Sequence, residues 1–438
     1  MRNQLLSLLA TAALCVTGAC RGQDEPGAEP AAGAPRTPAT TATTTTAAAT
    51  HAPAGEPRLE LYPTGARVTA ETGSSKASEP PRFPWRIGPR YNDRRVATDR
   101  QLFAVLDRMK PPTGVPDTNN IVHALRLWGP AARFQDPALF SGAQMRRYFL
   151  DEAAFRRWAG SGAPPLFSIS PEGVHVRMRE QGGGYRRTAA VHLDDVLATL
   201  AEIGTPLDQP LKTASGQADV RALLADAMRR FRISTTAATM SEWTLISYAR
   251  YLFPDRQWDT ESGRTVELEP IIDAFIDMPL PRGGCGGTHR LEALTVLYRA
   301  DEQAHALPAR ARKRILAYMT TVAALLVRTQ HQRGYWTKGW PDASAARQRA
   351  PMRPGERILV TGHHLEWLAL APPEVQPPRE HVIRAGQWLA RTMTEADVAT
   401  LARRYGPFSH AARALCLWRS VDPYQAWRSG REEFGGDK

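Results

Sequence analysis

Two short stretches of the chain each place a histidine and a glutamate three residues apart. "THRLEAL" contains His289 and Glu292, and "GHHLEWL" contains His363 and Glu366. Residues at this spacing share one face of a helix, so each stretch would present an imidazole beside a carboxylate. These groups serve in acid–base catalysis and in binding divalent metals. The repeat is therefore the first candidate for a functional site.

Weaker copies of this pattern extend the candidate set. "SHAARAL" places His410 at the histidine position and Arg413 at the glutamate position, and "SEWTL" places Glu242 and Trp243 at the glutamate and tryptophan positions. The predicted catalytic residues are His289, Glu292, His363, His364, Glu366 and His410. The predicted ligand-binding residues are Glu242, Trp243, Arg290, Arg413 and Trp336. Two further histidines stand at related positions: His123 and His192.

Three roles fit these residues. In the first, the histidines and glutamates are structural and hydrogen-bond helix ends and loops around a buried rim. In the second, a histidine or glutamate is the general acid or base for a sugar ring, and Arg290 or Arg413 neutralises a uronate carboxylate. In the third, the two His-x-x-Glu helices face each other and supply four metal ligands. No His-Glu-x-x-His zinc-protease motif is present, and no cofactor is predicted apart from this metal alternative.

The elements that must position these residues are helices. From about residue 98, apolar residues recur at spacings of three and four, which predicts an all-α fold of about twelve helices. Their expected ranges are 100–109, 119–129, 142–160, 192–204, 219–231, 240–253, 266–278, 288–300, 311–330, 362–370, 379–393 and 409–420. Residues 165–191 alternate instead, which predicts an inserted β-hairpin. Because glycines precede both His-Glu pairs, we expect each pair in the first turn of its helix.

The segment "LLVRTQHQRGYW" ends with Gln330, Gly334 and Trp336 in the spacing Q-x-x-x-G-x-W. This resembles the repeat of squalene and terpene cyclases, whose fold protein prenyltransferases share. The resemblance implies an (α/α)6 toroid at residues 95–430, with six inner helices around a funnel and six outer helices. It also implies that the His-Glu pairs ring one cavity. The element itself is expected to stabilise a joint, with Gln330 capping a helix, Gly334 permitting the reversal and Trp336 covering it.

The cyclase resemblance does not extend to catalytic motifs, because neither D-x-D-D nor D-D-x-x-D occurs in the chain. The chain also has no G-x-S-x-G motif, Walker loop or G-x-G-x-x-G motif after a strand, so serine hydrolase, NTPase and dinucleotide-binding functions are not predicted. Two functions stay open. One is an enzyme using histidine and glutamate in a central cavity on a glycan-like or lipid-like substrate. The other is a non-catalytic ligand- or protein-binding protein with a structural His/Glu ring.

The N-terminal region predicts export. Residues 1–19 combine a basic start with an apolar run and small residues, as in a secretory signal. "VTGAC" resembles a bacterial lipobox, which implies lipidation of Cys20, and ordinary cleavage near Ala19 is the alternative. Residues 20–80 are rich in Ala, Thr and Pro, which predicts a disordered tether. We therefore expect a periplasm-facing lipoprotein of the cell envelope, anchored to the membrane through Cys20.

The charge and the cysteines limit the partners. The formal net charge is +12, but the arginines are spread along the chain, so nucleic acid is not a predicted partner. A small molecule or glycan fits an exported protein better. Past Cys20 the chain has only Cys285 and Cys416, which are too few for a disulfide framework, and their pairing stays open.

Overall fold

The computed structural model describes the chain from residue 83 onward, apart from short gaps. The described ranges are 83–114, 117–171, 173–181, 183–232, 241–251, 257–281, 283, 285–347 and 354–435. The predicted signal at 1–19, the lipidation site Cys20 and the tether at 20–80 lie outside the described residues. Within these ranges, no helix combines the length and apolar character that a membrane crossing requires.

Most of the described residues form helices, which confirms the predicted helical character. The helices are α1 (Asp99–Arg108), α2 (Thr118–Trp128), α3 (Gly142–Leu150), α4 (Glu152–Ala159), α5 (Asp195–Glu202), α6 (Val220–Arg229), α7 (Glu242–Tyr251), α8 (Leu268–Asp277), α9 (Thr288–Ala304), α10 (Ala309–Thr329), α11 (Ala343–Arg347), α12 (Pro354–Leu370), α13 (Arg379–Glu395), α14 (Val398–Arg403), α15 (Tyr405–Trp418) and α16 (Pro423–Phe434). Three of these helices were not predicted from the sequence: α11, α14 and α16.

The described residues contain three separate β-hairpins rather than one. The predicted hairpin is present, with β1 (Phe167–Ser170) antiparallel to β2 (Gly173–Val176). The other two hairpins were not predicted: β3 (Pro210–Thr213) with β4 (Gly216–Asp219), and β5 (Gln257–Asp259) with β6 (Thr265–Glu267). Strands β3 and β4 ("PLKT" and "GQAD") contain few apolar residues, and β5 and β6 have only three residues each, so no period of two stands out in the sequence.

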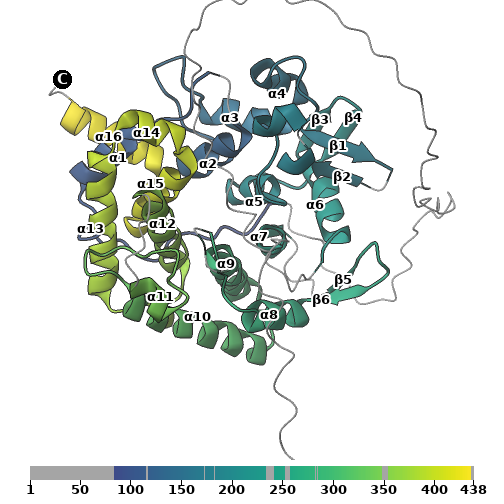
Figure 1. Cartoon of the computed structure of the whole chain (residues 1–438). Helices are drawn as coiled ribbons and strands as arrows, with labels where there is room; N and C mark the ends of the chain where they lie inside the picture. The colour runs from purple at the N-terminus through teal and green to yellow at the C-terminus, as the bar shows by residue number, and fades with distance from the viewer. Residues whose placement is uncertain are drawn as a thin grey trace, which may run out of the picture. The chain divides into compact units, whose positions relative to one another are not determined.

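Six helices contact one another in a closed cycle, which we call the six-helix ring. In order around the cycle they are α2, α5, α7, α9, α12 and α15, and α15 contacts α2 again (Figure 1). These helices are buried on nearly every side, including the polar positions of α9 and α15. A helix that is buried all round requires neighbours on all sides. By contrast, α10 buries a single stripe and contacts α9 with it.

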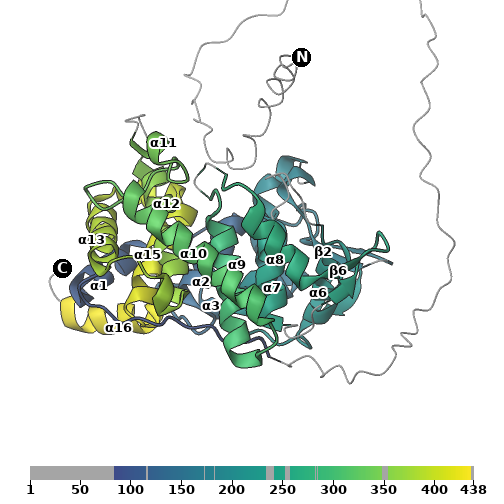
Figure 2. The ribbon, with the colours of Figure 1, turned by 90° about the horizontal axis from the view of Figure 1, so that it is seen from below.

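An extended N-terminal segment covers one end of the six-helix ring. The backbone nitrogen of Trp85 donates to the carbonyl of Arg250 in α7 at 2.8 Å, and that of Asp93 donates to Trp418 in α15 at 2.9 Å. The backbone nitrogen of Arg90 donates to the carbonyl of Ala369 in α12 at 3.1 Å. The last carbonyls of a helix lack partners within that helix, so the segment satisfies helix ends. It runs past the C-terminal ends of these ring helices (Figure 2).

The Gln330 element is a joint between α10 and α13, as the sequence predicted. The Gln330 amide donates to the carbonyl of Gly334 at 2.9 Å and to that of His381 in α13 at 2.8 Å. Gly334 has φ +101°, and a Cβ there would lie 2.4 Å from a carbonyl oxygen of α13. The buried Trp336 indole donates to Leu326 in α10 at 2.9 Å. Each residue of the motif therefore has a structural contact.

Two predicted helix boundaries are wrong. Helix α12 begins at Pro354, so His363 lies in its middle and not in its first turn. Gly362 lies inside this helix and does not form a turn. A Cβ at this position would come within 2.8 Å of a backbone nitrogen of α15, so the glycine permits the close packing of the two helices. The predicted helix at 142–160 is broken at Asp151, whose extended backbone and carboxylate cap the start of α4.

Candidate functional site

A layer of buried ion pairs joins five helices inside the six-helix ring. Arg126 of α2 donates to Glu202 of α5 at 2.9 Å and to Glu292 of α9 at 2.8 Å. Arg413 of α15 donates to Glu366 of α12 at 2.8 Å and also pairs with Glu202. We call these five residues the central ion-pair network. Because each arginine contacts two carboxylates from different helices, the network ties the ring helices together.

Burial makes the charges of the central ion-pair network depend on one another. Burial raises the pKa of the Glu202 carboxyl, but the guanidinium groups of Arg126 and Arg413 outweigh it and bring the pKa to about 2. The Arg126 side chain is 2% exposed, and its guanidinium also lies 4.8 Å from the ring centre of Trp243 in α7. Removing one member would leave its partners charged and buried, which is costly.

Five histidines form a continuous chain of ring contacts, which we call the histidine cluster. The ring centres of His192 and His289 are 5.3 Å apart, and those of His289 and His363 are 4.9 Å apart. The chain continues from His363 to His410 at 3.8 Å and from His410 to His123 at 4.6 Å. These residues come from α2, α9, α12, α15 and the segment before α5. The cluster therefore collects side chains from across the six-helix ring.

Burial keeps four histidines of the cluster neutral: His123, His192, His289 and His410. Burial lowers the pKa of His192 to about 4 and that of His410 to about 3. Burial also holds the pKa values of His123 and His289 well below the ordinary value of a histidine. A neutral imidazole keeps one nitrogen with a proton and one with a free lone pair. Such a nitrogen can accept a proton or bind a metal ion.

Glu366 connects the ion-pair network to the histidine cluster. Its Oε1 accepts from Arg413, while its Oε2 accepts from His410 Nδ1 at 2.7 Å and lies 3.3 Å from His363 Nδ1. Burial raises the pKa of this carboxyl, but the attraction of His410 and Arg413 holds it well below its ordinary value. An ionised carboxylate only accepts hydrogen bonds. We therefore assign the protons to Nδ1 of both histidines, with the lone pairs on Nε2.

Two groups in this region could hold a metal ion. In the first, Cys285 Sγ and one nitrogen each of His289 and His363 lie within 4.8 Å of one another. In the second, the same limit holds for ligand atoms of His363, Glu366 and His410. Among the described residues, neither His289 Nδ1 nor His363 Nε2 has a hydrogen-bond partner. In the third role considered from the sequence, the two His-x-x-Glu pairs would supply four metal ligands. The structure does not favour that set, because Glu292 pairs with Arg126.

The other predicted residues lie apart from the histidine cluster or beside it. Trp243 is the nearest, with its ring centre 4.8 Å from that of His289. His364 packs instead against tryptophans, with its ring centre 4.5 Å from Trp340, and its Nδ1 accepts from Trp367 at 3.2 Å. Trp336 contacts this second side of α12. The structure therefore separates His363 from His364, which the sequence placed in one set.

Arg290 and Glu242 lie at the junction of α7, α8 and α9. Arg290 donates to the carbonyl oxygen of Met278 at 2.7 Å, just after α8. Glu242 begins α7, and burial raises the pKa of its carboxyl, partly offset by the charge of Arg290. Within the described part of the chain, no hydrogen bond or ring contact joins either residue to the histidine cluster. Their predicted role in ligand binding therefore has no contact with His363 or His410 to support it.

Sequence reasoning missed three residues of the site. Cys285 was left out of the predicted site residues, and no disulfide joins it to Cys416. The signal was its position four residues before His289. Arg126 and Glu202 were also missed, although Arg126 lies within the apolar run "ALRLW" and Glu202 ends the apolar run "VLATLAE". A lone charge within an apolar run indicates a buried partner elsewhere in the chain.

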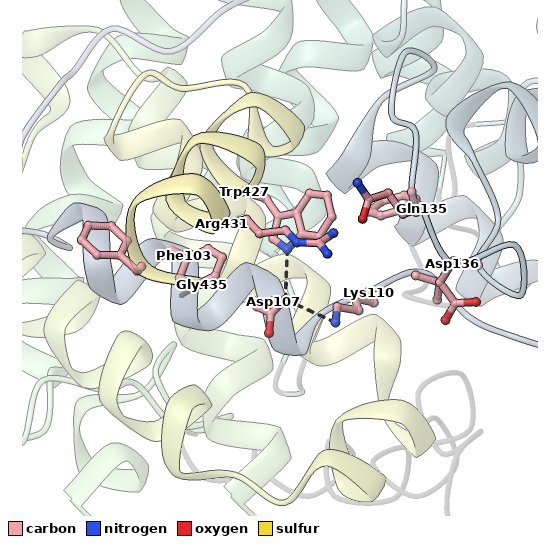
Figure 3. A pocket seen from close by; sticks show the side chains of 11 residues that line it. Phe103, Asp107, Lys110, Gln135, Asp136, Trp427, Arg431 and Gly435 are labelled. Carbon is pink, nitrogen blue, oxygen red and sulfur yellow. Dashed lines mark hydrogen bonds and ion pairs between the residues drawn. The ribbon is translucent and has the colours of Figure 1, made fainter. Parts of the chain in front are cut away.

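A pocket of about 370 Å³ lies on the outside of the helices, between α1 and α16 (Figure 3). Aromatic residues including Phe103 and Trp427 line it. Asp107 accepts from the Trp427 indole at 3.1 Å and lies 3.2 Å from the Lys110 ammonium group, so these three polar groups pair with one another. No residue of the histidine cluster lines this pocket.

The comparisons with known proteins do not place the chain in a family. No family model, curated protein or solved structure matches it. The resemblance of the Gln330 element to the cyclase repeat therefore stays a prediction, and the function must be inferred from the geometry of the interior.

Proposed function

We propose that the chain is an exported protein of the cell envelope, anchored to the membrane by a lipid on Cys20, whose described part is an α/α toroid. The closed cycle of six nearly fully buried helices supports the toroid, as does the single buried stripe of α10 outside it. The signal-like start and the tether at 20–80 support export and anchoring. In this arrangement, the tether holds the helical domain away from the membrane surface.

The interior of the toroid is the reaction centre of an enzyme that acts on a glycan-like or lipid-like substrate. The observation that supports this proposal is the position of Glu366, whose carboxylate bonds His410 at 2.7 Å and lies 3.3 Å from His363. The carboxylate orients both imidazoles and would stabilise the imidazolium that forms when His410 takes a proton from the substrate. Nε2 of His410 is the proton-accepting atom in this scheme.

The substrate would reach the cluster from the N-terminal ends of the ring helices. His123 and His192 are only partly buried, while His363 and His410 are fully enclosed. His289 and Trp243 lie in the first turns of α9 and α7. The opposite ends of α7, α12 and α15 are covered by the segment from Trp85 to Asp93.

A substrate screen with matched histidine variants tests the enzyme proposal. We expect the purified chain to turn over a member of a panel of acidic glycans and prenyl lipids. His410→Ala should lower the rate about 10²–10⁴-fold, the usual contribution of a general acid or base. His175→Ala is the control, because His175 lies in β2 outside the cluster and should leave the rate unchanged. Equal rates for the wild-type chain and His410→Ala would contradict the proposal.

The alternative is a non-catalytic binding protein of the cell envelope. One observation favours it: the predicted catalytic residue Glu292 is paired with Arg126, and Glu366 with Arg413, so the glutamates have structural partners. In that case the histidine cluster would also be structural. The two functions differ in what the substitutions change, since a structural role predicts loss of stability and an enzymatic role predicts loss of turnover at unchanged stability.

A further inference from the structure

We propose that Cys285, His289 and His363 form a binding site for one zinc-class divalent metal ion. Their sulphur and nitrogen atoms lie within 4.8 Å of one another. They come from the loop before α9, from the first turn of α9 and from the middle of α12. Thiolate and imidazole are the ligands that zinc prefers. Three protein ligands leave a fourth position for water or substrate, as in catalytic rather than structural zinc sites.

The ligand atoms of the two histidines are inferred from which ring nitrogens lack a hydrogen-bond partner among the described residues. His363 Nδ1 faces Glu366, so the nitrogen with the lone pair is Nε2. His363 is 3% exposed and His289 is 2% exposed. Within the described part of the chain, His363 Nε2 and His289 Nδ1 have no hydrogen-bond partner. Buried polar atoms without partners are rare in proteins, and coordination of one ion would satisfy both atoms at once.

Glu366 is a positioning residue for this site. A metal-binding histidine commonly donates its other nitrogen to a carboxylate, which fixes the ring and raises its basicity. Glu366 Oε2 provides that carboxylate oxygen to His363, 3.3 Å from its Nδ1. Arg413 holds Glu366 from the other side at 2.8 Å. The chain therefore contains both the inner ligands and the outer support that a zinc site requires.

The second candidate group is a poorer site for the ion. In that group, Glu366 Oε2 already accepts from His410 and faces the Nδ1 of His363, while Oε1 accepts from Arg413. A metal ion bound there would displace the protons of both imidazoles. In the group of Cys285, His289 and His363, the ion would bind His289 Nδ1 and His363 Nε2. Among the described residues these two nitrogens have no hydrogen bond that the ion would have to break.

The spacing of the three ligands is close to that of a tetrahedral ion. Bonds of about 2.0–2.3 Å place tetrahedral ligand atoms roughly 3.3–3.8 Å apart. The ligand atoms here lie within 4.8 Å, so closure requires a shift of about 1.5 Å or less. Cys285 precedes the first residue of α9 and is only partly buried, so its sulphur can make this shift without distorting a helix.

Metal binding by the full chain tests this site without any substrate. We would load the reduced, purified protein with Co²⁺ and record the thiolate-to-cobalt absorption band, and measure zinc content after loading with Zn²⁺. We expect one ion per chain and a band that disappears in Cys285→Ala. Cys416→Ala is the matched control, because Cys416 is buried in α15 and belongs to neither metal group. Glu366→Gln should weaken Co²⁺ binding about 10–100-fold while keeping the band.

The site would be overturned by a wild-type chain that binds neither ion stoichiometrically, or by a band that persists in Cys285→Ala. A band lost equally in Cys416→Ala would overturn it as well. The result is separable from the proposed function, which it extends with a cofactor. A chain that binds the ion but turns over no substrate supports the metal site and contradicts the enzyme. A chain that turns over substrate but binds no ion supports the enzyme and contradicts the metal site.

Discussion

Replacement of Arg126 with methionine should destabilise the protein by about 3–5 kcal/mol, the range measured when one partner of a buried ion pair is removed. Arg126 pairs with Glu292, and it shares Glu202 with Arg413. Without it, the Glu292 carboxylate is buried with no opposite charge within bonding distance among the described residues. Urea unfolding of the variant and the wild-type chain measures the difference in the free energy of unfolding.

Two further variants make this prediction specific. Arg94→Met removes an arginine that is 78% exposed and 3.5 Å from Asp99, so it should cost less than about 1 kcal/mol. The double variant Arg126→Met, Glu292→Leu removes both charges of one pair and should be more stable than Arg126→Met alone. A loss below about 1 kcal/mol for Arg126→Met would show that the network does not hold the ring helices together.

Replacement of Gly362 with alanine should loosen the packing of α12 against α15 and disturb the site. The new Cβ would lie 2.8 Å from the backbone nitrogen of Ala411 and 3.1 Å from the carbonyl carbon of His410. Because these are backbone atoms, the helices must separate, at a cost of about 1–3 kcal/mol. The same shift lengthens the 2.7 Å hydrogen bond from His410 to Glu366.

We therefore expect Gly362→Ala to lower both the free energy of unfolding and the rate of turnover. Gly88→Ala is the control, because no atom lies within 4 Å of its added Cβ, and its stability should stay within about 0.5 kcal/mol. If Gly362→Ala matched Gly88→Ala in both measurements, the close approach of α12 and α15 would not position His410.

The convergence of His289, His363, Glu366 and His410 could be predicted because it follows from local pattern. Each residue occupies the histidine or the glutamate position of a similar phrase on a helix, and similar helices repeated around a ring place similar positions together. The turn assigned to Gly362 was wrong for a physical reason. Glycine permits both a turn and a close helix contact, and the sequence does not distinguish them until the neighbouring helix is known.

The partners of the charged residues could not be predicted in the same way. Glu292 and Glu366 occupy equivalent places in the two phrases, yet Glu292 pairs with Arg126 and Glu366 with Arg413 and His410. These pairs join residues that are far apart in the sequence. Which arginine reaches which glutamate depends on the rotation of each helix in the ring, and local periodicity gives only the buried face.

The central claim is that the interior has a structural layer, the central ion-pair network, and a functional layer, the histidine cluster. The most direct test is the free energy of unfolding of His289→Leu, measured in the presence of a chelator. His289 Nδ1 is buried without a hydrogen-bond partner among the described residues, so a leucine of similar size removes an unsatisfied polar atom. We predict stability equal to or above that of the wild-type chain, with loss of metal binding and turnover. A loss of stability as large as that of Arg126→Met would contradict the claim and show that the histidine cluster is structural.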